Sequence, residues 1–452
     1  MSQTQYHFFF FISMLLPFFI VSSYVHSQIQ CLEDQKTLLL QLKNTLVFNS
    51  SYSTKLVKWN KTRDCCSWDG IECDSAGHVI TLNLEYETIL GGIDNSSSFF
   101  GLRYLEKLNL AFNKFDGEIQ IYNLTHLTHL NLSHAGFGGQ VQIELSRLRS
   151  LVSLDLSATF MTVLKLEHPN LKMLVQNLTG LRELKLDRVD ILAQGSDWCL
   201  VISSSLPNLR ILSLIDCNLS GPLDPSLLPL YYLSVLRLDW NNLSPSVLAL
   251  FANFSSLTTL SLCHCSLQGT FPAMIFQMPT LQYLDLSLNE LLSVTVPQFF
   301  QSRSLRIMFL SSTNSSGSLP NSISNFSMLS TIDLSGCKFS GSIPSTLFNP
   351  TELTYVYLSG NFFTGSIPPF HLSKKLTHIH LGNNRLTGSL SSTHFKGLLN
   401  LEYIDLGYNM LGGSIPESLF GLSSLQCLHL SKNQFRGAVN EFSIPILLAC
   451  IP

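Results

Sequence analysis

Residues 102–119 read LRYLEKLNLAFNKFDGEI, and this stretch decides the fold. Its pattern is LxxLxxLxLxxNxFxGxI, where x is any residue, and the pattern recurs along the chain in a fixed register, mostly in steps of 24 residues. The central apolar residue of each unit stands at Leu108, Leu130, Leu154, Leu184, Leu212, Leu236, Leu260, Leu284, Met308, Ile332, Val356, Ile379, Ile404 and Leu428. A repeat of this length predicts a solenoid of stacked coils.

Each LxL segment predicts a short strand whose two leucines point inward while its other side chains point outward. One coil cannot bury its own apolar face, so neighbouring coils must share one continuous core. The predicted fold is an α/β repeat solenoid of the leucine-rich-repeat type. It is a right-handed superhelix with a parallel β-sheet on the concave face and an N-terminal helical disulfide cap. About fifteen coils fill residues 78–439.

One inward-facing position of the repeat carries a polar residue in many coils. It is asparagine in many units, at Asn113, Asn241, Asn289, Asn361, Asn384, Asn409 and Asn433. An amide there can bond backbone groups of the turn, each of which would cost roughly 1–3 kcal/mol if buried and unpaired. Three units carry Cys217, Cys265 and Cys337 instead. A small buried thiol fits such a slot, so we interpret these cysteines as core residues.

Residues 28–77 predict a cap over the open end of the core. One face of a predicted helix carries Leu38, Leu42 and Leu46, and Trp59 and Trp68 can fill the end of the core. The cap also holds Cys31, Cys65, Cys66 and Cys73. Four cysteines permit three disulfide pairings. A four-cysteine zinc site is the alternative, which the adjacency of two of the cysteines and a secretory signal disfavour.

Residues 1–27 are interpreted as that signal, with an apolar run from Phe8 to Val21 and cleavage before Gln28. The region before the run has no lysine or arginine, so an N-terminal anchor helix is the alternative. Export would place the chain in an oxidising compartment, where disulfides persist. After removal of the signal, no stretch has the length and apolar character of a membrane span.

The composition excludes several classes of function. A net charge of -3 is too small to indicate binding to nucleic acid or to an anionic membrane. No phosphate loop, nucleophile elbow or zinc-protease helix occurs. His126, His129 and His134 differ in repeat phase, and Cys265 points inward whereas Cys263 does not, so neither group is interpreted as a metal site. We expect no catalytic residue, no metal and no cofactor.

The register lengthens between Leu154 and Leu212, and the additional residues within 157–205 are expected to form surface loops. The chain has 11 cysteines, an odd number, which leaves at least one thiol outside any intrachain bridge. Cys199 lies in the second of these loops, and Cys199 and Cys217 are the candidates for a disulfide across it.

The phrase GSIP, at residues 341–344, 365–368 and 413–416, resembles the plant-specific class of leucine-rich repeat. With the cap, and with phrases such as CLEDQKTLLLQLK at 31–43 and LDRVD at 186–190, residues 28–445 resemble the plant extracellular receptor-like proteins of Verticillium-wilt-resistance type. The resemblance implies a lateral strand at the GSIP phrases. It also implies that the cap bridges are Cys31–Cys65 and Cys66–Cys73.

The same resemblance implies a receptor in the plant plasma membrane. Such a receptor recognises a microbial or plant protein or peptide and signals in defence through partner receptor kinases. Residues 440–452 break the repeat as an irregular tail, so we expect a chain truncated relative to that family. A soluble decoy of a longer receptor is one alternative. A secreted inhibitor of microbial cell-wall-degrading enzymes, which has fewer coils and a closed cysteine cap, is another.

Aromatic residues and histidines gather in three successive coils at Tyr355, Tyr357, His378, His380, Tyr403 and Tyr408. A looser group stands upstream at Arg237, Trp240, Tyr283 and Phe309. Tyrosine, tryptophan and arginine dominate binding hot spots, although strands also favour aromatic residues on structural grounds. We expect a protein or peptide ligand to bind the concave face near residues 355–408.

N-linked glycans are expected at N-x-S/T sequons of an exported chain. The sequons are at Asn49, Asn60, Asn95, Asn123, Asn131, Asn177, Asn218, Asn242, Asn253, Asn314 and Asn325. Four of them, Asn123, Asn177, Asn253 and Asn325, precede their central strand residue by seven positions, which places them along one edge. Asn131 is expected on the concave face, and no sequon follows Asn325, so the last coils stay bare. Alternatively, the repeat phrase generates these sequons and many remain unmodified.

Overall fold

The computed structural model describes residues 30–93, 98–116, 124–159, 161–192, 197–243, 248–298, 304–370 and 372–437. The predicted signal sequence, residues 1–27, and the predicted irregular tail, residues 440–452, lie outside these ranges. A bilayer-spanning helix is not found in the described part of the chain, where every helix is too short or too polar.

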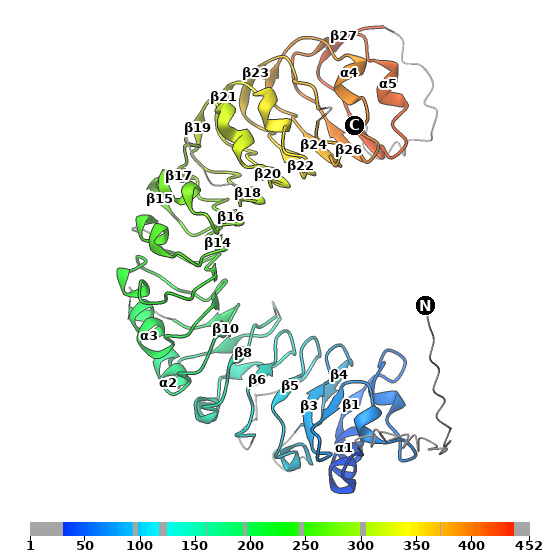
Figure 1. The fold of residues 1–452 in the computed structure, drawn as a ribbon, viewed down its shortest axis with the longest axis vertical. Coiled ribbons are helices and arrows are strands. Elements are labelled where there is room, and N and C mark those ends of the chain that lie inside the picture. The colour runs from blue at the N-terminus through cyan, green and yellow to red at the C-terminus, as the bar shows by residue number, and fades with distance from the viewer. Residues whose placement is uncertain are drawn as a thin grey trace, which may run out of the picture.

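The solenoid curves into an arc whose inner side is a 16-stranded sheet (Figure 1). In order, the strands are β2 Ile71–Cys73, β3 Val79–Asn83, β5 Lys107–Asn109, β6 His129–Asn131, β8 Ser153–Asp155, β10 Glu183–Lys185, β12 Ile211–Ser213, β13 Val235–Arg237, β14 Thr259–Ser261, β16 Tyr283–Asp285, β18 Ile307–Phe309, β20 Thr331–Asp333, β22 Tyr355–Tyr357, β24 His378–His380, β26 Tyr403–Asp405 and β28 Cys427–His429. β2 is antiparallel to β3, and the later strands are parallel.

The register of this sheet is the one that the repeat predicts. Leu130 pairs with Leu108 on one side and with Leu154 on the other, and the same column continues to Leu428. Leu82 of β3 extends the column one coil earlier than the pattern indicated. The column is buried throughout, and each fully buried leucine contributes roughly 1.5–3 kcal/mol relative to exposure. The shared core therefore fixes which side chains face outward.

The inward asparagines bond the backbone as predicted, and Asn289 shows the pattern. Its Oδ1 accepts the backbone N–H of Cys265 and that of Leu267, both at 3.0 Å, from the preceding coil. Its Nδ2 donates to three carbonyl oxygens at 2.8–3.2 Å. Bonds of the same kind occur at Asn113, Asn241, Asn361, Asn384, Asn409 and Asn433. Each amide thus links consecutive coils.

The outer side carries lateral strands, as the resemblance implied. They are β7 Gly139–Gln140, β9 Leu164–Lys165, β11 Val189–Asp190, β15 Gln268–Thr270, β17 Leu291–Ser293, β19 Ser316–Gly317, β21 Lys338–Ser342, β23 Phe362–Gly365, β25 Arg385–Leu386, β27 Gly412–Gly413 and β29 Gln434–Phe435. Short helical turns complete the coils at η3 Ser98–Gly101, η4 Ile143–Arg147, η5 Pro225–Leu227, η6 Leu248–Asn253, η7 Ala273–Gln277, η8 Asn321–Asn325, η9 Ser345–Phe348, α4 Ser392–Phe395 and α5 Glu417–Phe420.

The additional residues within 157–205 were predicted to form surface loops, and this prediction is wrong for two segments of the long coils. These are helices α2 Leu171–Val175 and α3 Asp197–Ser205, which lie on the outer side (Figure 1). Trp198 and Ile202 stand four positions apart on one face of α3 and are buried, with Trp198 only 1% exposed. The added residues therefore enlarge the core.

The candidate bridge between Cys199 and Cys217 is also wrong, because both residues are unbonded and buried. Cys199 lies in α3, whereas Cys217 occupies the slot of the inward asparagines. There its thiol donates to the carbonyl oxygen of Leu186 at 3.0 Å. Cys265 and Cys337 occupy the same slot in their own coils, as predicted. Burial raises the pKa of Cys199 to about 12 and also raises the pKa of Cys217.

These four thiols, Cys199, Cys217, Cys265 and Cys337, are expected to resist alkylation while the protein is folded. Only the thiolate reacts, and burial both raises the pKa and blocks access. Iodoacetamide at pH 8 followed by peptide mass spectrometry should leave them unmodified until denaturant is added. A Cys199–Cys217 disulfide peptide in the freshly purified protein would contradict the assignment.

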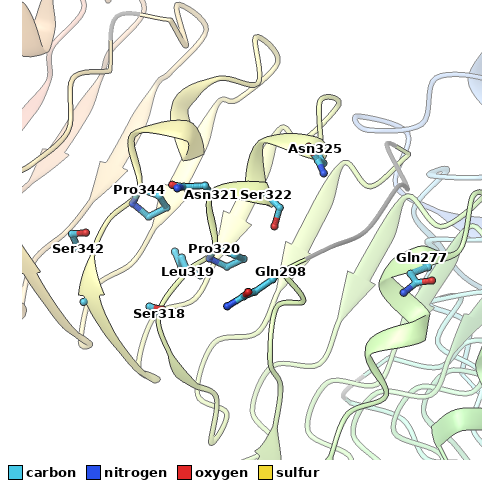
Figure 2. A pocket seen from close by; sticks show the side chains of 11 residues that line it. Gln277, Gln298, Ser318, Leu319, Pro320, Asn321, Ser322, Asn325, Ser342 and Pro344 are labelled. Carbon is cyan, nitrogen blue, oxygen red and sulfur yellow. The ribbon is translucent and has the colours of Figure 1, made fainter.

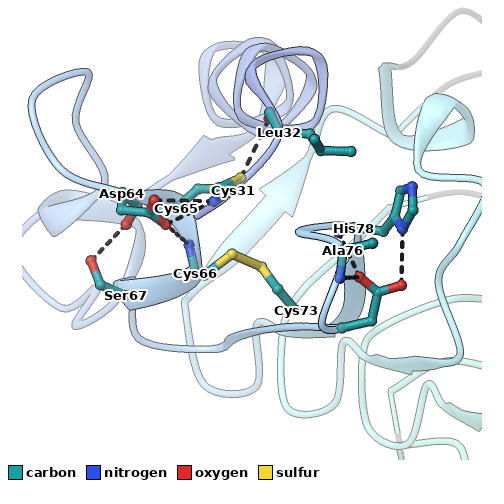
Figure 3. Close-up of a disulfide and its surroundings, with 10 residues drawn as sticks. Cys31, Leu32, Asp64, Cys65, Cys66, Ser67, Cys73, Ala76 and His78 are labelled. Carbon is teal, nitrogen blue, oxygen red and sulfur yellow. Dashed lines mark hydrogen bonds and ion pairs between the residues drawn. A yellow bond between two sulfur atoms is a disulfide. The ribbon is translucent and has the colours of Figure 1, made fainter. Parts of the chain in front are cut away.

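The cap covers the first coil and contains α1 Glu33–Thr45, β1 Val47–Phe48, η1 Leu56–Lys58 and η2 Cys65–Ser67. Its strand β1 pairs antiparallel with β4 Ile89–Gly91 of the first coil. Its bridges are Cys31–Cys65 and Cys66–Cys73, as the resemblance implied, and they tie η2 to the chain on either side (Figure 3). Trp59 and Trp68 stack with their centroids 5.2 Å apart and are buried, as predicted for the end of the core.

Glu87, a buried carboxylate that the sequence did not single out, joins the cap to the first coil. It accepts the backbone N–H groups of Thr54, Lys55 and Leu56 at 3.0–3.1 Å, and the hydroxyl of Ser53 as well. Burial tends to raise the pKa of this carboxyl, but the hydrogen bonds outweigh burial, and the pKa lies below its usual value. The ionised carboxylate is therefore part of the fold.

Candidate functional site

The structure brings five of the predicted ligand-binding residues together on the concave face. Tyr355 and Tyr357 lie on β22, His378 and His380 on β24, and Tyr403 on β26. The register places Tyr355, His378 and Tyr403 in one row across the three strands. All five side chains are half-buried. We call these five residues the ring patch.

Within the ring patch the ring planes are close to parallel. The rings of His380 and Tyr403 have centroids 4.3 Å apart and planes 12° apart, and those of Tyr357 and His380 are 4.6 Å and 33° apart. Side chains stand roughly perpendicular to a sheet, so such rings cover one another's faces and turn their tips outward. A ligand on this surface would therefore meet tyrosine hydroxyls and imidazole edges, which are polar, rather than open aromatic faces.

Two carboxylates flank the ring patch, and the sequence did not single them out. One register row runs Asp333, Tyr357, His380 and Asp405 across β20 to β26. Burial lowers the pKa of His380, although Asp405 acts in the opposite direction. Burial also raises the pKa of Tyr357, with Tyr355 and Asp333 adding to the effect. Both rings are therefore neutral at neutral pH.

Tyr408 lies beside His429, another residue that sequence reasoning missed. It follows β26 in a turn of positive φ, and 49% of its surface is exposed. Its ring meets that of His429 edge-on at 6.2 Å, and His429 Nδ1 lies 2.9 Å from Asp405 Oδ1. His429 lies in the register row of His380 and Asp405, two strands after His380. Its spacing from His380 in the repeat is the sequence signal that could have identified it.

The upstream residues Arg237 and Trp240 lie apart from the ring patch. Arg237 ends β13, five strand steps from β22, which is about 24 Å at the usual spacing. Trp240 lies in the following turn, where its ring packs on His264 at 4.3 Å. Tyr283 and Phe309 contact each other edge-on at 5.8 Å between these two regions. The looser upstream group is thus a surface apart from the ring patch.

Near Tyr283, the ligand atoms of Asp239, Cys263 and Asp285 lie within 4.8 Å of one another. Their polar atoms already have partners. Asp239 accepts from the Ser261 hydroxyl at 2.7 Å, and the Ser287 hydroxyl reaches both Cys263 Sγ and Asp285. Burial raises the pKa of both carboxyls and raises that of Cys263 to about 11. Since these side chains already pair with neighbouring hydroxyls and backbone groups, we assign no metal site.

A hollow of about 1160 Å³ lies beside η8, between Gln277 of η7 and Ser342 of β21 (Figure 2). Its lining is polar, with Gln277, Gln298, Ser318 and Asn321, and the sequon residue Asn325 stands at its rim (Figure 2). Residues 299–303, which follow Gln298 in the sequence, lie outside the described part of the chain, so no site is assigned to this hollow.

The sequon residues within the described ranges are accessible to different degrees. Asn49, Asn60, Asn218, Asn242, Asn253 and Asn325 are exposed, and Asn131, Asn177 and Asn314 are partly exposed. Asn95 and Asn123 lie outside the described residues. Asn253 and Asn325 each end an outer helical turn, η6 and η8, so their shared sequence phase is also a shared position. Whether these side chains carry glycans stays a prediction.

Comparison with protein families gives the same assignment along the chain. The model of the leucine-rich-repeat N-terminal domain matches residues 32–74. Leucine-rich-repeat models match residues 123–140, 255–315, 328–350, 352–372 and 374–435. The cap and the coils thus fall into recognised modules.

Curated relatives include plant receptor-like proteins. Receptor-like protein 6 of Arabidopsis thaliana is 34% identical over 275 residues, which is 54% of this chain and 27% of that protein. Receptor-like protein Cf-9 of Solanum pimpinellifolium is 36% identical over 245 residues, covering 49% and 26% of the two chains. The matched part is thus about a quarter of the length of these relatives.

Solved structures with similar folds include peptide receptors of plants. The Arabidopsis receptor kinase HAESA, in complex with the peptide hormone IDA and the co-receptor SERK1, has a TM-score of 0.75 at 27% identity. The match covers 89% of this chain and 70% of that one. The plant peptide hormone receptor RGFR1, in complex with RGF2, has a TM-score of 0.63 at 28% identity, with 82% and 61% covered.

Proposed function

We propose that this chain, which is similar to plant leucine-rich-repeat receptor-like proteins, is a ligand-binding ectodomain whose ring patch holds a protein or peptide. The observation that carries the proposal is the ring patch itself. Five tyrosine and histidine side chains from three strands converge on the concave face, where packing of the core does not require them. Residues of this kind dominate hot spots.

Three features support this use of the concave face. HAESA and RGFR1, which share the fold, are described as complexes with peptide hormones. The ring patch is rigid, because its residues lie on paired strands, and a rigid surface loses little entropy when a ligand binds. No sequon follows Asn325, so glycans would leave the coils of the ring patch accessible.

We further propose that the chain acts in plant defence at the cell surface. The ligand is then a microbial protein or peptide, and partner receptor kinases carry the signal. The phrases at 31–43 and 186–190, which resemble the Verticillium-wilt-resistance type, support this role, and HAESA with its co-receptor offers a precedent for the kinase partner. Leaves that express the tagged chain should yield receptor kinases in pull-downs after treatment with a wilt-fungus culture filtrate. Recovery of the same kinases without treatment would contradict ligand-dependent signalling.

The binding proposal predicts a large effect of removing three rings. Peptides selected from a displayed random dodecapeptide pool on the wild-type protein should bind the Tyr357→Ala, His380→Ala, Tyr403→Ala variant about 100-fold more weakly, because hot-spot side chains carry most of the binding energy. The dissociation constants are measured by surface plasmon resonance. His129→Ala, an exposed histidine on β6 of the same face, is the matched control. Equal affinity of the triple variant and the wild type would exclude the ring patch as the site.

A further inference from the structure

Apart from histidines, the strands that hold the ring patch carry no basic side chain at their outward positions on the concave face. From β14 to β28 the first and third residues of each strand include neither lysine nor arginine, whereas earlier strands carry Lys107, Lys185 and Arg237. The same later strands carry Asp285, Asp333 and Asp405. The ring patch therefore lies in an acidic part of the concave face.

The fold does not require these negative charges. Asp333 ends its strand and accepts the backbone N–H of the residue two positions on, Ser335, at 2.8 Å. Asp285 and Asp405 make the same bond at 2.9 Å. In the first coils, neutral amides perform this task, since Asn109 and Asn131 each accept the equivalent N–H at 3.0 Å. An asparagine would therefore satisfy the backbone equally well.

One of these charges, that of Asp285, is also unfavourable for the protein alone. Burial raises the pKa of Asp285, which means that the local environment disfavours its ionised form. Among the described residues, no lysine, arginine or histidine forms an ion pair with Asp285 or Asp333, whereas Asp155 at the same strand position pairs with Lys185 at 3.7 Å. A positive group supplied from outside would neutralise these carboxylates.

Asp333 is the carboxylate best placed to meet a ligand on the ring patch. It pairs in register with Tyr357, which pairs with His380, so the carboxylate, the phenol and the imidazole form one row on neighbouring strands. The outward tip of Tyr357 offers a hydroxyl oxygen as a second acceptor beside it. An arginine side chain has five N–H donors in a planar fork and can reach both acceptors together.

We propose that the ligand segment seated on the ring patch carries an arginine or lysine whose cation binds Asp333 beside Tyr357. The inference rests on the proposed function and adds the ligand's chemistry to it. The occupant is an extended basic peptide segment, either a free peptide or part of a protein. An acidic or uncharged ligand would leave Asp333 buried beneath it without a counter-charge, which strongly disfavours binding.

A double-mutant cycle tests this pairing with the selected dodecapeptides as the probe. Peptides that need the ring patch for binding should be enriched in arginine and lysine. Replacing the anchoring arginine by citrulline, its neutral isostere, should weaken binding to the wild-type protein roughly 10-fold to 100-fold, since a charge-assisted hydrogen bond is lost. The Asp333→Asn variant should bind the arginine peptide more weakly than the wild type does, by a similar factor. It should bind the arginine peptide and the citrulline peptide with equal affinity.

Asp333→Asn keeps the hydrogen bond to Ser335, so the variant is expected to fold. Asp155→Asn is the matched control, because Asp155 has the same strand position and bonds the backbone N–H of Ser157 at 3.1 Å. It should preserve the full difference between the arginine and citrulline peptides. Ring-patch peptides without basic residues, or independent effects of the two changes, would overturn the inference and leave the proposed function intact. If no selected peptide depends on the ring patch for binding, both the proposed function and this inference are contradicted.

Discussion

Replacing Asn289 by alanine is expected to lower the free energy of unfolding by roughly 3–5 kcal/mol, because several buried backbone groups lose their only side-chain partner. The amide of Asn289 bonds two backbone N–H groups of the preceding coil and three carbonyl oxygens. Alanine leaves the slot dry and apolar, so water cannot replace these bonds without opening the coil. In a solenoid the loss acts on the local interface between coils.

Urea unfolding followed by circular dichroism measures this effect, and Asn321→Ala provides the control. Asn321 is exposed in η8, so its replacement should change the stability by less than about 0.5 kcal/mol. The stability loss for Asn289→Cys should lie between those for Asn289→Ala and Asn321→Ala, because the thiols of Cys265 and Cys337 in this slot each donate to a carbonyl oxygen. A loss below about 1 kcal/mol for Asn289→Ala would mean that the backbone finds other partners.

The contrast between asparagine and cysteine in this slot also explains how much of the fold the sequence predicts. A fixed period selects the inward residues, and the requirement to pair buried backbone groups selects their chemistry. Both are local rules that repeat every coil. For this reason the strand register, the inward asparagines and the buried Cys217, Cys265 and Cys337 could all be assigned before the structure was known.

Prediction failed where the period itself changes. In the coils between Leu154 and Leu212, added residues could either leave the core as loops or enlarge it. The segment DWCLVISSS became α3 because Trp198 and Ile202 share a helical face that packs inward. The spacing of Cys199 and Cys217 along the chain says nothing of whether their side chains point toward each other, and both point into the core.

The same limit holds for the candidate site. The register predicts that Tyr355, His378 and Tyr403 become neighbours, and the structure confirms it. The orientation of their rings depends on mutual packing, which no sequence period encodes. Asp333 and Asp405 were missed because an aspartate at this position is a satisfactory partner for a backbone N–H. Its charge became informative only when Asn109 and Asn131 were found in the identical role.

Replacing Glu87 by glutamine is expected to lower the free energy of unfolding by about 3 kcal/mol at pH 7, since three backbone N–H groups and two hydroxyls converge on one buried carboxylate. Glutamine keeps the size of the side chain but offers one acceptor oxygen and turns an NH₂ toward other donors. The cap should then detach from the first coil at lower denaturant concentration. Fluorescence of Trp59 and Trp68 would report this step.

The pH dependence separates the charge of Glu87 from its shape. Its pKa is lowered in the folded protein, so its contribution is fully present above the ordinary carboxyl pKa of about 4.3 and is lost as the pH falls through the lowered value. The stability difference between wild type and Glu87→Gln should therefore be constant from pH 6 to pH 8 and shrink below about pH 4. Glu106→Gln, at an exposed glutamate, should show no such change. A difference that persists unchanged at low pH would show that the shape of the side chain, and not its ionised carboxylate, holds the cap to the first coil.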